Sequence, residues 1–246
     1  MQHALNFAGQ TVLVVGGSSG IGNGIAQAFR AAGAGVHVWG TRPDAAAYAS
    51  ETGSDLEGLH YSQVDVADDA AIESSVPAFE QLHVLVLAQG AVLYDRQEYA
   101  MPAFRKVVNV NLHSLMACSL KFYAMLKRTR GALITVSSTA VYHANVGNPA
   151  YNASKAGAVG LTRTLGAAWA KDGITVNGIA PGLVATKMTK ITTDNPKRLD
   201  AALGRIPVGR LGTPADMAGV ALFLASPLSG YIVGHTIPAD GGLILV

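Results

Sequence analysis

The stretch TVLVVGGSSGIG, which runs from Thr11 to Gly22, decides the fold. Its first five residues form a short apolar run, which is typical of a parallel β-strand covered on both faces. A glycine-rich turn follows, and apolar residues at helical spacing then continue to Gly33. In this context the backbone N–H groups of the turn can point at an anion, and a pyrophosphate can approach closely. The alternative is a tight connection between packed elements, but the flanks favour nucleotide binding.

Strands and helices alternate along the rest of the chain. Six more strands are expected at 36–39, 59–64, 84–87, 132–136, 175–179 and 235–239. Four more helices are expected at 68–79, 101 to about 128, about 151 to 173, and 214 to about 224. The polar segment at about 187–210 has no clear period and indicates a lid or substrate-binding loop.

This order predicts an α/β protein with a Rossmann-type, doubly wound parallel sheet of about seven strands and helices on both faces. No linker, charge block or internal repeat divides the chain, so a single domain over residues 1–246 is expected. Ligands of such sheets bind outside the carboxyl ends of the strands. The glycine turn, Gly90, Ser138 and the break at Pro181 all follow predicted strands, so they should converge on one crevice.

The composition narrows the class of protein. Of the 246 residues, 50% are hydrophobic and 14% are charged, so the chain can bury a large core. The formal net charge is only +2 and the basic residues are scattered, which argues against a nucleic-acid partner. No apolar run is long enough to span a membrane, and the N-terminal stretch lacks the pattern of a secretory leader. Cys118 is the only cysteine, which fits a reducing compartment, and a cytoplasmic protein is therefore expected.

A second stretch, from Ala132 to Lys155, carries the candidate chemistry. Its strand ends next to Ser138, and the following helix places Tyr151 and Lys155 one turn apart on the same face. A free tyrosine has a pKa near ~10, and a neighbouring ammonium group would lower that pKa. The Ser138 hydroxyl could hold a carbonyl oxygen on which negative charge develops. Taken alone, Tyr and Lys at this spacing also occur by chance on many helices.

With these motifs in order, nearly the whole chain resembles the short-chain dehydrogenase/reductase family, in its shorter single-domain branch, and is similar to 3-oxoacyl-carrier-protein reductase-like members. The resemblance implies an oxidoreductase that passes a hydride between nicotinamide C4 and the carbon of a carbonyl or secondary alcohol. It implies that Tyr151 is the general acid or base and that Ser138 positions the substrate oxygen. Lys155 would hold the nicotinamide ribose and lower the Tyr151 pKa, and Asn111 would anchor a water that relays protons. An amide inside a helix is otherwise most often simply exposed.

The residues and the resemblance together give a set of expected contacts. Asp65 and Val66 match the family's adenine-contacting pair, and Val184 and Thr186 match the segment that holds the nicotinamide amide. The expected cofactor contacts are Gly16, Ser18, Ser19, Gly20, Ile21, Gly22, Thr41, Arg42, Asp65, Val66, Ala88, Gln89, Gly90, Tyr151, Lys155, Pro181, Gly182, Val184 and Thr186. The expected substrate contacts are Ser138, Thr139, Ala140, Tyr142, His143, Asn145, Tyr151, Leu183 and Met188. No metal is expected, and His143 also fits an ordinary loop histidine.

Two positions depart from the family pattern. Val15 stands where the family has a threonine, and Gln89 lies in a segment, LAQG, where Asn-Asn-Ala-Gly is usual. The two residues that usually connect the glycine turn to the fourth strand have therefore both changed. This paired change predicts local repacking behind the nicotinamide ribose rather than loss of function.

The end of the second strand bears on the choice of cofactor. A carboxylate there would bond both ribose hydroxyls and repel a 2′-phosphate, but the chain has Gly40, Thr41 and Arg42, with Asp44 further on. Thr41 and Arg42 can donate to a phosphate, so NADP(H) is favoured over NAD(H). Against this, Ser19 stands where many NADP-preferring relatives carry a basic residue, and Arg42 also fits a solvated loop charge.

Other readings stay open at this point. A non-catalytic nucleotide-binding regulatory protein could share the fold, although the presence of all four catalytic residues argues against it. Epimerisation and dehydration are less expected for so short a chain. The expected substrate contacts are mostly apolar or neutral and favour a neutral or hydrophobic small molecule. Acyl-carrier substrates, steroids, sugars and small ketones are all still possible.

The resemblance also implies a homotetramer. The helices that include Met101 and Tyr151 would pack in one interface, and the C-terminal segment would form another. Small residues on the second of these helices would allow close approach: Ala156, Gly157 and Gly160.

Overall fold

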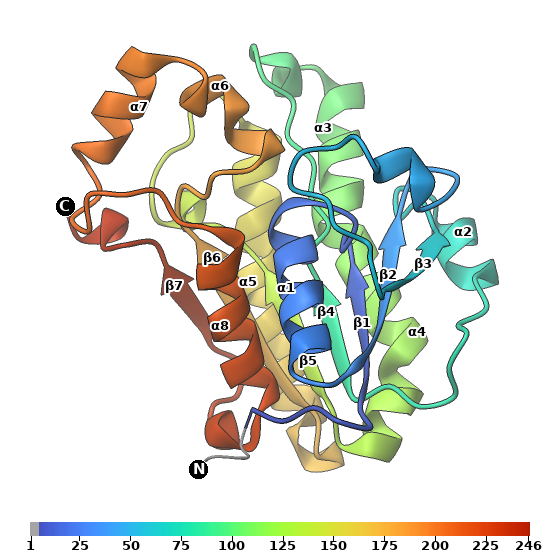
Figure 1. Ribbon diagram of the computed structural model, residues 1–246. Helices are drawn as coiled ribbons and strands as arrows, with labels where there is room; N and C mark the ends of the chain where they lie inside the picture. Colours follow the sequence, from blue (N-terminus) through green and yellow to red (C-terminus); the bar gives the residue numbers. More distant parts are fainter. Residues whose placement is uncertain (1–4) are drawn as a thin grey trace.

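The computed structural model describes residues 5–246 (Figure 1). The first part of the stretch on which the leader prediction rests, residues 1–4, lies outside the described residues. Seven parallel strands form one sheet in the order β3-β2-β1-β4-β5-β6-β7. The strands are β1 Thr11–Val15, β2 Gly35–Gly40, β3 His60–Gln63, β4 Val84–Leu87, β5 Ala132–Val136, β6 Thr175–Pro181 and β7 Thr236–Ala239. This confirms the predicted fold class.

Helices cover both faces of the sheet (Figure 1). The α-helices are α1 Gly20–Ala31, α2 Asp69–Ser74, α3 Met101–Val108, α4 Ser114–Thr129, α5 Pro149–Trp169, α6 Lys190–Thr193, α7 Pro196–Leu203 and α8 Pro214–Ala225. Short turns of 3₁₀-helix are η1 Ala46–Tyr48, η2 Gln97–Tyr99, η4 Thr139–Tyr142, η5 Ala170–Asp172, η6 Lys187–Thr189, η7 Pro227–Ser229 and η8 Leu243–Leu245, and η3 Asn109–His113 is a turn of π-helix. Over residues 5–246, none of the helices combines the length and the hydropathy that crossing a membrane requires.

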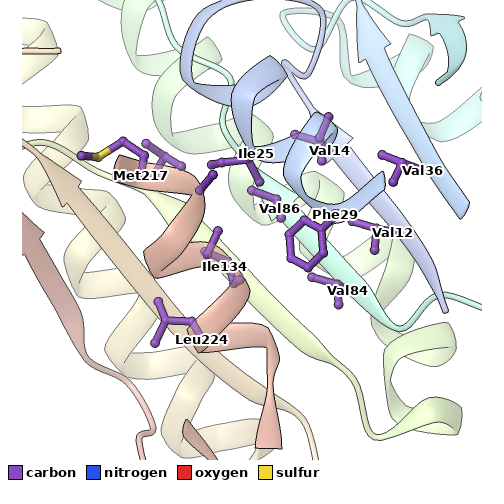
Figure 2. Packing of buried hydrophobic residues seen from close by; sticks show 14 of the residues in the cluster. Val12, Val14, Ile25, Phe29, Val36, Val84, Val86, Ile134, Met217 and Leu224 are labelled. Atoms are coloured by element: carbon purple, nitrogen blue, oxygen red, sulfur yellow. The ribbon is translucent and has the colours of Figure 1, made fainter. Parts of the chain in front are cut away.

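The alternation of side chains along β1 divides the core into two layers. Val12 and Val14 belong to the layer under α1 and α8, which also holds Phe29 (Figure 2). Leu13 and Val15 belong to the opposite layer, under α4 and α5. Both layers exclude water, so the last four residues of β1 are fully buried and only Thr11 is partly exposed. This is why the strand reads as an unbroken apolar run.

Three predicted elements differ from the structure. The predicted helix at 68–79 ends at Ser74, because Pro77 disfavours helical backbone in the residue before it. The segment at 187–210 is not a plain loop, because Asn195 caps α7 by accepting from two backbone N–H groups and Pro196 fits the first turn. The long helix that begins at Met101 is interrupted by the π turn η3, which no hydrophobic period reveals.

Candidate functional site

The carboxyl ends of the strands frame a pocket of about 600 Å³. It lies at the switch point of the sheet, where β1 has β2 on one side and β4 on the other. The predicted residues that line it are Gly16, Ser18, Ser19, Gly20, Ile21, Gly22, Thr41, Asp65, Val66, Ala88, Gln89, Gly90, Ser138, Tyr151, Lys155, Pro181, Gly182, Val184, Thr186 and Met188. The expected cofactor end and the expected reacting groups therefore share one cavity.

The glycine turn is packed too tightly for side chains. A Cβ atom on Gly22 would lie 2.2 Å from the Gly16 carbonyl oxygen, and one on Gly16 would lie 2.8 Å from the backbone of Gln89. Gly16 and Gly20 also have positive φ angles, of 76° and 58°. The Ser19 side chain makes no capping hydrogen bond to α1 in the described chain. This leaves a narrow backbone cradle at a helix N-terminus, which fits a pyrophosphate.

Gln89 accounts for the departure from the family pattern at the end of β4. Its Nε2 donates to Ser114 Oγ over 2.9 Å, so the side chain ties β4 to the first residue of α4. Its Oε1 is buried and has no hydrogen-bond partner among the described residues. An unsatisfied buried acceptor costs about 1–3 kcal/mol. Because Gln89 lines the pocket, a ligand with hydroxyl groups, such as a ribose, fits there.

The three predicted reacting groups come from two neighbouring elements, the end of β5 and the first turns of α5. Lys155 Nζ donates to the Val136 carbonyl oxygen over 2.8 Å and lies 5.8 Å from the centre of the Tyr151 ring. Ser138 Oγ accepts from the Ala140 amide, which fixes the start of the loop that follows β5. Burial lowers the pKa of Lys155 to about 8.

The pKa of Tyr151 departs from the predicted direction. Burial of the phenol raises it, a hydrogen bond with Ser138 lowers it, and the charge of Glu98 raises it, with a net increase. The predicted lowering by Lys155 is wrong for this arrangement, because the ammonium group is directed to Val136 and loss of hydration dominates.

Asn111 lies in the π turn and is fully buried, so it is not an exposed helix amide. Its Oδ1 accepts from the Ala91 amide over 2.7 Å, and its Nδ2 donates to the Ala91 carbonyl oxygen over 2.9 Å and to Ser154 Oγ over 3.1 Å. The side chain thus fastens the segment after β4 to α5, which positions Gly90 against Lys155. π turns are frequent at functional sites. The role as a water anchor stays a prediction.

The other predicted residues lie outside this pocket. The Arg42 guanidinium forms an ion pair with Glu51 and lies 4.5 Å from the centre of the Tyr48 ring. Leu183 lines a second, smaller pocket. Thr139 and Ala140 are buried, whereas Tyr142, His143 and Asn145 lie on an exposed loop.

Several lining residues carry no prediction, among them Trp39, Ala91, Lys106 and Val110. Lys187 and Thr189 also line the pocket, and they lie in the segment at 187–210 that the sequence predicts as a lid or substrate-binding loop. Glu51, which pairs with both Lys187 and Arg42, gave no sequence signal in its polar surroundings.

Comparison with known proteins identifies relatives over the whole chain. Residues 15–244 match a family model described as enoyl-(acyl carrier protein) reductase. A 2-dehydro-3-deoxy-D-gluconate 5-dehydrogenase of Bacillus subtilis is 36% identical over 98% of this chain and 97% of the relative. The 3-oxoacyl-[acyl-carrier-protein] reductase FabG of Chlamydia pneumoniae is 36% identical over 97% of this chain and 98% of its own length. A Beutenbergia cavernae structure with NADP bound at low occupancy superposes with a TM-score of 0.87 and 34% identity, covering 99% of this chain and 100% of that one.

We predict that Gly22→Ala severely weakens cofactor binding, because the new Cβ would collide with the backbone of Gly16. The matched control is Gly219→Ala, also within a helix, where an added Cβ meets no atom within 4 Å. Binding is measured by fluorescence titration with NADPH and NADH, and folding is checked by circular dichroism. Equal affinities of a folded Gly22→Ala variant and the control would contradict the assignment of the cradle.

Proposed function

The chain belongs to the short-chain dehydrogenase/reductase family and is an NAD(P)-dependent oxidoreductase. We propose that in this enzyme Tyr151 exchanges the proton with the reacting oxygen. One observation carries the proposal: Tyr151, Ser138 and Lys155 line the same pocket as the glycine turn. A bound nicotinamide cofactor supplies or accepts the hydride. The rival, a non-catalytic binding protein, is not favoured, since the named relatives are a dehydrogenase and a reductase.

In the proposed reaction each residue has one task. Ser138 donates a hydrogen bond to the carbonyl oxygen and holds it beside the phenol. Tyr151 donates its proton to that oxygen during reduction and takes the proton back during oxidation. Tyr151 is protonated at neutral pH in the cofactor-free protein, because the ordinary pKa of a tyrosine is near ~10 and burial raises that of Tyr151 further. Lys155 would bond the cofactor ribose, and Asn111 would hold the backbone around Gly90 in register.

We predict that Tyr151→Phe lowers kcat by at least about a hundredfold, because the residue that transfers the proton is lost. NADPH affinity should change little, since the glycine cradle is untouched. Tyr231→Phe is the matched control, because Tyr231 is a fully exposed tyrosine with no proposed role in the site. Rates are measured in both directions with a panel of ketones, secondary alcohols, sugar acids and acyl thioesters. Near-normal turnover by Tyr151→Phe would refute the catalytic assignment.

The substrate class follows from the charges around the reacting groups. Lys155 donates one hydrogen bond to Val136 and is assigned to the cofactor ribose, and Lys187 pairs with Glu51 over 3.2 Å. Met188 and Ala91 add apolar wall to the pocket. This supports a neutral or apolar carbonyl over the anionic sugar acid that the name of the Bacillus relative indicates. The panel used for Tyr151→Phe separates the two classes.

NADP(H) is the cofactor we propose, in preference to NAD(H). Thr41 lines the pocket at the end of β2, and Arg42 is the next residue. Glu51 neutralises Arg42 and also pairs with Lys187, so two cations meet beside the pocket. A 2′-phosphate could share both cations, because Arg and Lys form charge-assisted hydrogen bonds to phosphate. The Beutenbergia structure with bound NADP supports the same choice.

We predict opposite effects of two substitutions on cofactor choice. Arg42→Ala should lower the ratio of kcat/KM with NADPH to that with NADH by about tenfold to a hundredfold, the value of one charge-assisted hydrogen bond. Glu51→Gln should raise this ratio, because it frees Arg42 and Lys187 for the phosphate. The wild type should prefer NADPH. The proposal fails if NADH is preferred, or if the two variants leave the ratio unchanged.

A homotetramer is also proposed, with α4 and α5 in one interface. Leu120 and Met116 are exposed on α4, and Gly160 is exposed on α5 with open space beside it. Gly157 does not serve this interface, because a Cβ there would lie 2.7 Å from the Leu112 side chain of the same chain. Leu245 is exposed in the C-terminal segment, where the second interface is expected.

A cytoplasmic location remains a proposal from the sequence.

We predict a mass of four chains for the wild type in light scattering at micromolar concentration. Leu120→Arg should give smaller species, because it buries an unpaired charge in the interface. Arg30→Ala, at an exposed position of α1 across the sheet from α4 and α5, tests whether any change of surface charge has the same effect. A monomeric wild type, or a Leu120→Arg tetramer, would rule out this interface.

A further inference from the structure

A buried carboxylate lies next to the first turn of α5. Glu98, in η2, is only 1% exposed. Its Oε2 accepts from the Tyr151 amide over 2.9 Å, and its Oε1 accepts from the Leu93 amide over 3.0 Å. No Lys, Arg or His within residues 5–246 forms an ion pair with it. Burying a charge without a cation is costly unless several hydrogen-bond donors compensate. The cost of burying Glu98 therefore points to a specific role for its carboxylate.

The hydrogen bonds of Glu98 join three parts of the chain that frame the pocket. Leu93 follows β4, η2 precedes α3, and Tyr151 lies in the first turn of α5. Asn148, the residue before α5, closes the ring by donating from Nδ2 to the Leu93 carbonyl oxygen over 2.8 Å. The positive end of the α5 dipole favours a carboxylate at this position. Glu98 thereby fixes the backbone of Tyr151 relative to the segment after β4.

Glu98 also acts on the phenol of Tyr151 through its charge. The titratable or charged groups around Tyr151 are Lys155 on its own helix, Glu98 from η2 and Tyr94 from the segment after β4. Ser138, from the end of β5, is the neutral hydrogen-bond partner. Lys155 donates to the Val136 carbonyl oxygen, and its Nζ lies 5.8 Å from the centre of the Tyr151 ring. The Glu98 charge makes the phenolate less stable and so raises the pKa of Tyr151.

We propose that Glu98 is a positioning residue for the reaction: it pins the backbone of Tyr151 to the segment after β4 and places a negative charge next to the first turn of α5. The proposal rests on the catalytic role proposed for Tyr151. It assigns two separable effects to one carboxylate, a geometric effect through its hydrogen bonds and an electrostatic effect through its charge. A purely structural residue would have only the first.

Three variants separate these effects. Glu98→Gln keeps the size of the side chain but removes the charge, and Glu98→Asp keeps the charge but shortens the reach. Tyr99→Phe is the matched control, because it removes a neutral hydrogen bond from the same turn, the one to the Val146 carbonyl oxygen. For each variant, kcat is measured against pH in the oxidation direction, in which Tyr151 must be deprotonated. NADPH affinity and thermal stability are measured alongside.

In Glu98→Gln we expect the rising limb of the pH profile to shift to lower pH by about half a pH unit or more, because the phenolate loses a negatively charged neighbour. Its kcat at the plateau should fall about tenfold to a hundredfold, because the reacting group is misplaced. Glu98→Asp should show the lower kcat with the limb of the wild type. Tyr99→Phe should keep both. NADPH affinity should stay within about twofold throughout, since Glu98 does not line the pocket that holds the glycine cradle.

A direct titration keeps this inference separate from the proposed function. The ultraviolet absorbance of phenolate, taken as the difference between each Glu98 form and the same form with Tyr151→Phe, gives the Tyr151 pKa without any turnover. A lower pKa in Glu98→Gln than in the wild type supports the electrostatic effect even where no tested substrate reacts. The inference is overturned if Glu98→Gln leaves this pKa and the pH limb unchanged. It is also overturned if kcat falls only in proportion to the folded fraction.

Discussion

The contact between the glycine turn and the end of β4 sets the position of the pocket. The chain runs from β1 outward to β3 and then returns to place β4 on the other side of β1. Because Gly16 has no side chain, its backbone can approach Gln89 to within a distance that a Cβ would not allow. This close approach aligns the N-terminus of α1 with the end of β4, and the pocket opens between them. Every residue of the proposed site is placed relative to that junction.

Burial governs the ionisation of the two central groups, and it drives both toward their neutral forms. It raises the pKa of Tyr151 and lowers the pKa of Lys155 to about 8. The sequence places a cation one turn from a phenol and predicts attraction between them, whereas the folded chain directs that cation to a carbonyl oxygen of β5. A ligand that brings hydroxyl groups and charge to this pocket would change the balance. In the resting state the phenol is protonated, and binding of the cofactor has to bring its pKa closer to neutrality for efficient proton transfer.

The sequence predicts those elements in which the residue types directly indicate the burial and the secondary structure. Buried parallel strands are continuous apolar runs, so Val84–Leu87 was found at its observed bounds. The π turn was missed, because one extra residue in a helix leaves the hydrophobic pattern almost intact. The end of α2 and the start of α7 were misjudged although Pro77, Asn195 and Pro196 carry recognised signals. Glu98 could not be found, since its partners lie up to 53 residues away and only the tertiary fold brings them together.

The distribution of charge divides the pocket into two ends with different selectivity. Near the proposed reacting groups the charges are fixed within the chain: Lys155 by Val136, and Glu98 by backbone amides. The groups proposed to hold the substrate oxygen are neutral, the hydroxyls of Ser138 and Tyr151. At the other end the ion pairs of Glu51 are partly exposed, so they can be exchanged for pairs with a phosphate. In the proposed function, a phosphate-rich cofactor and a neutral carbonyl therefore bind at opposite ends of one cavity for the same physical reason, the cost of leaving a charge unpaired.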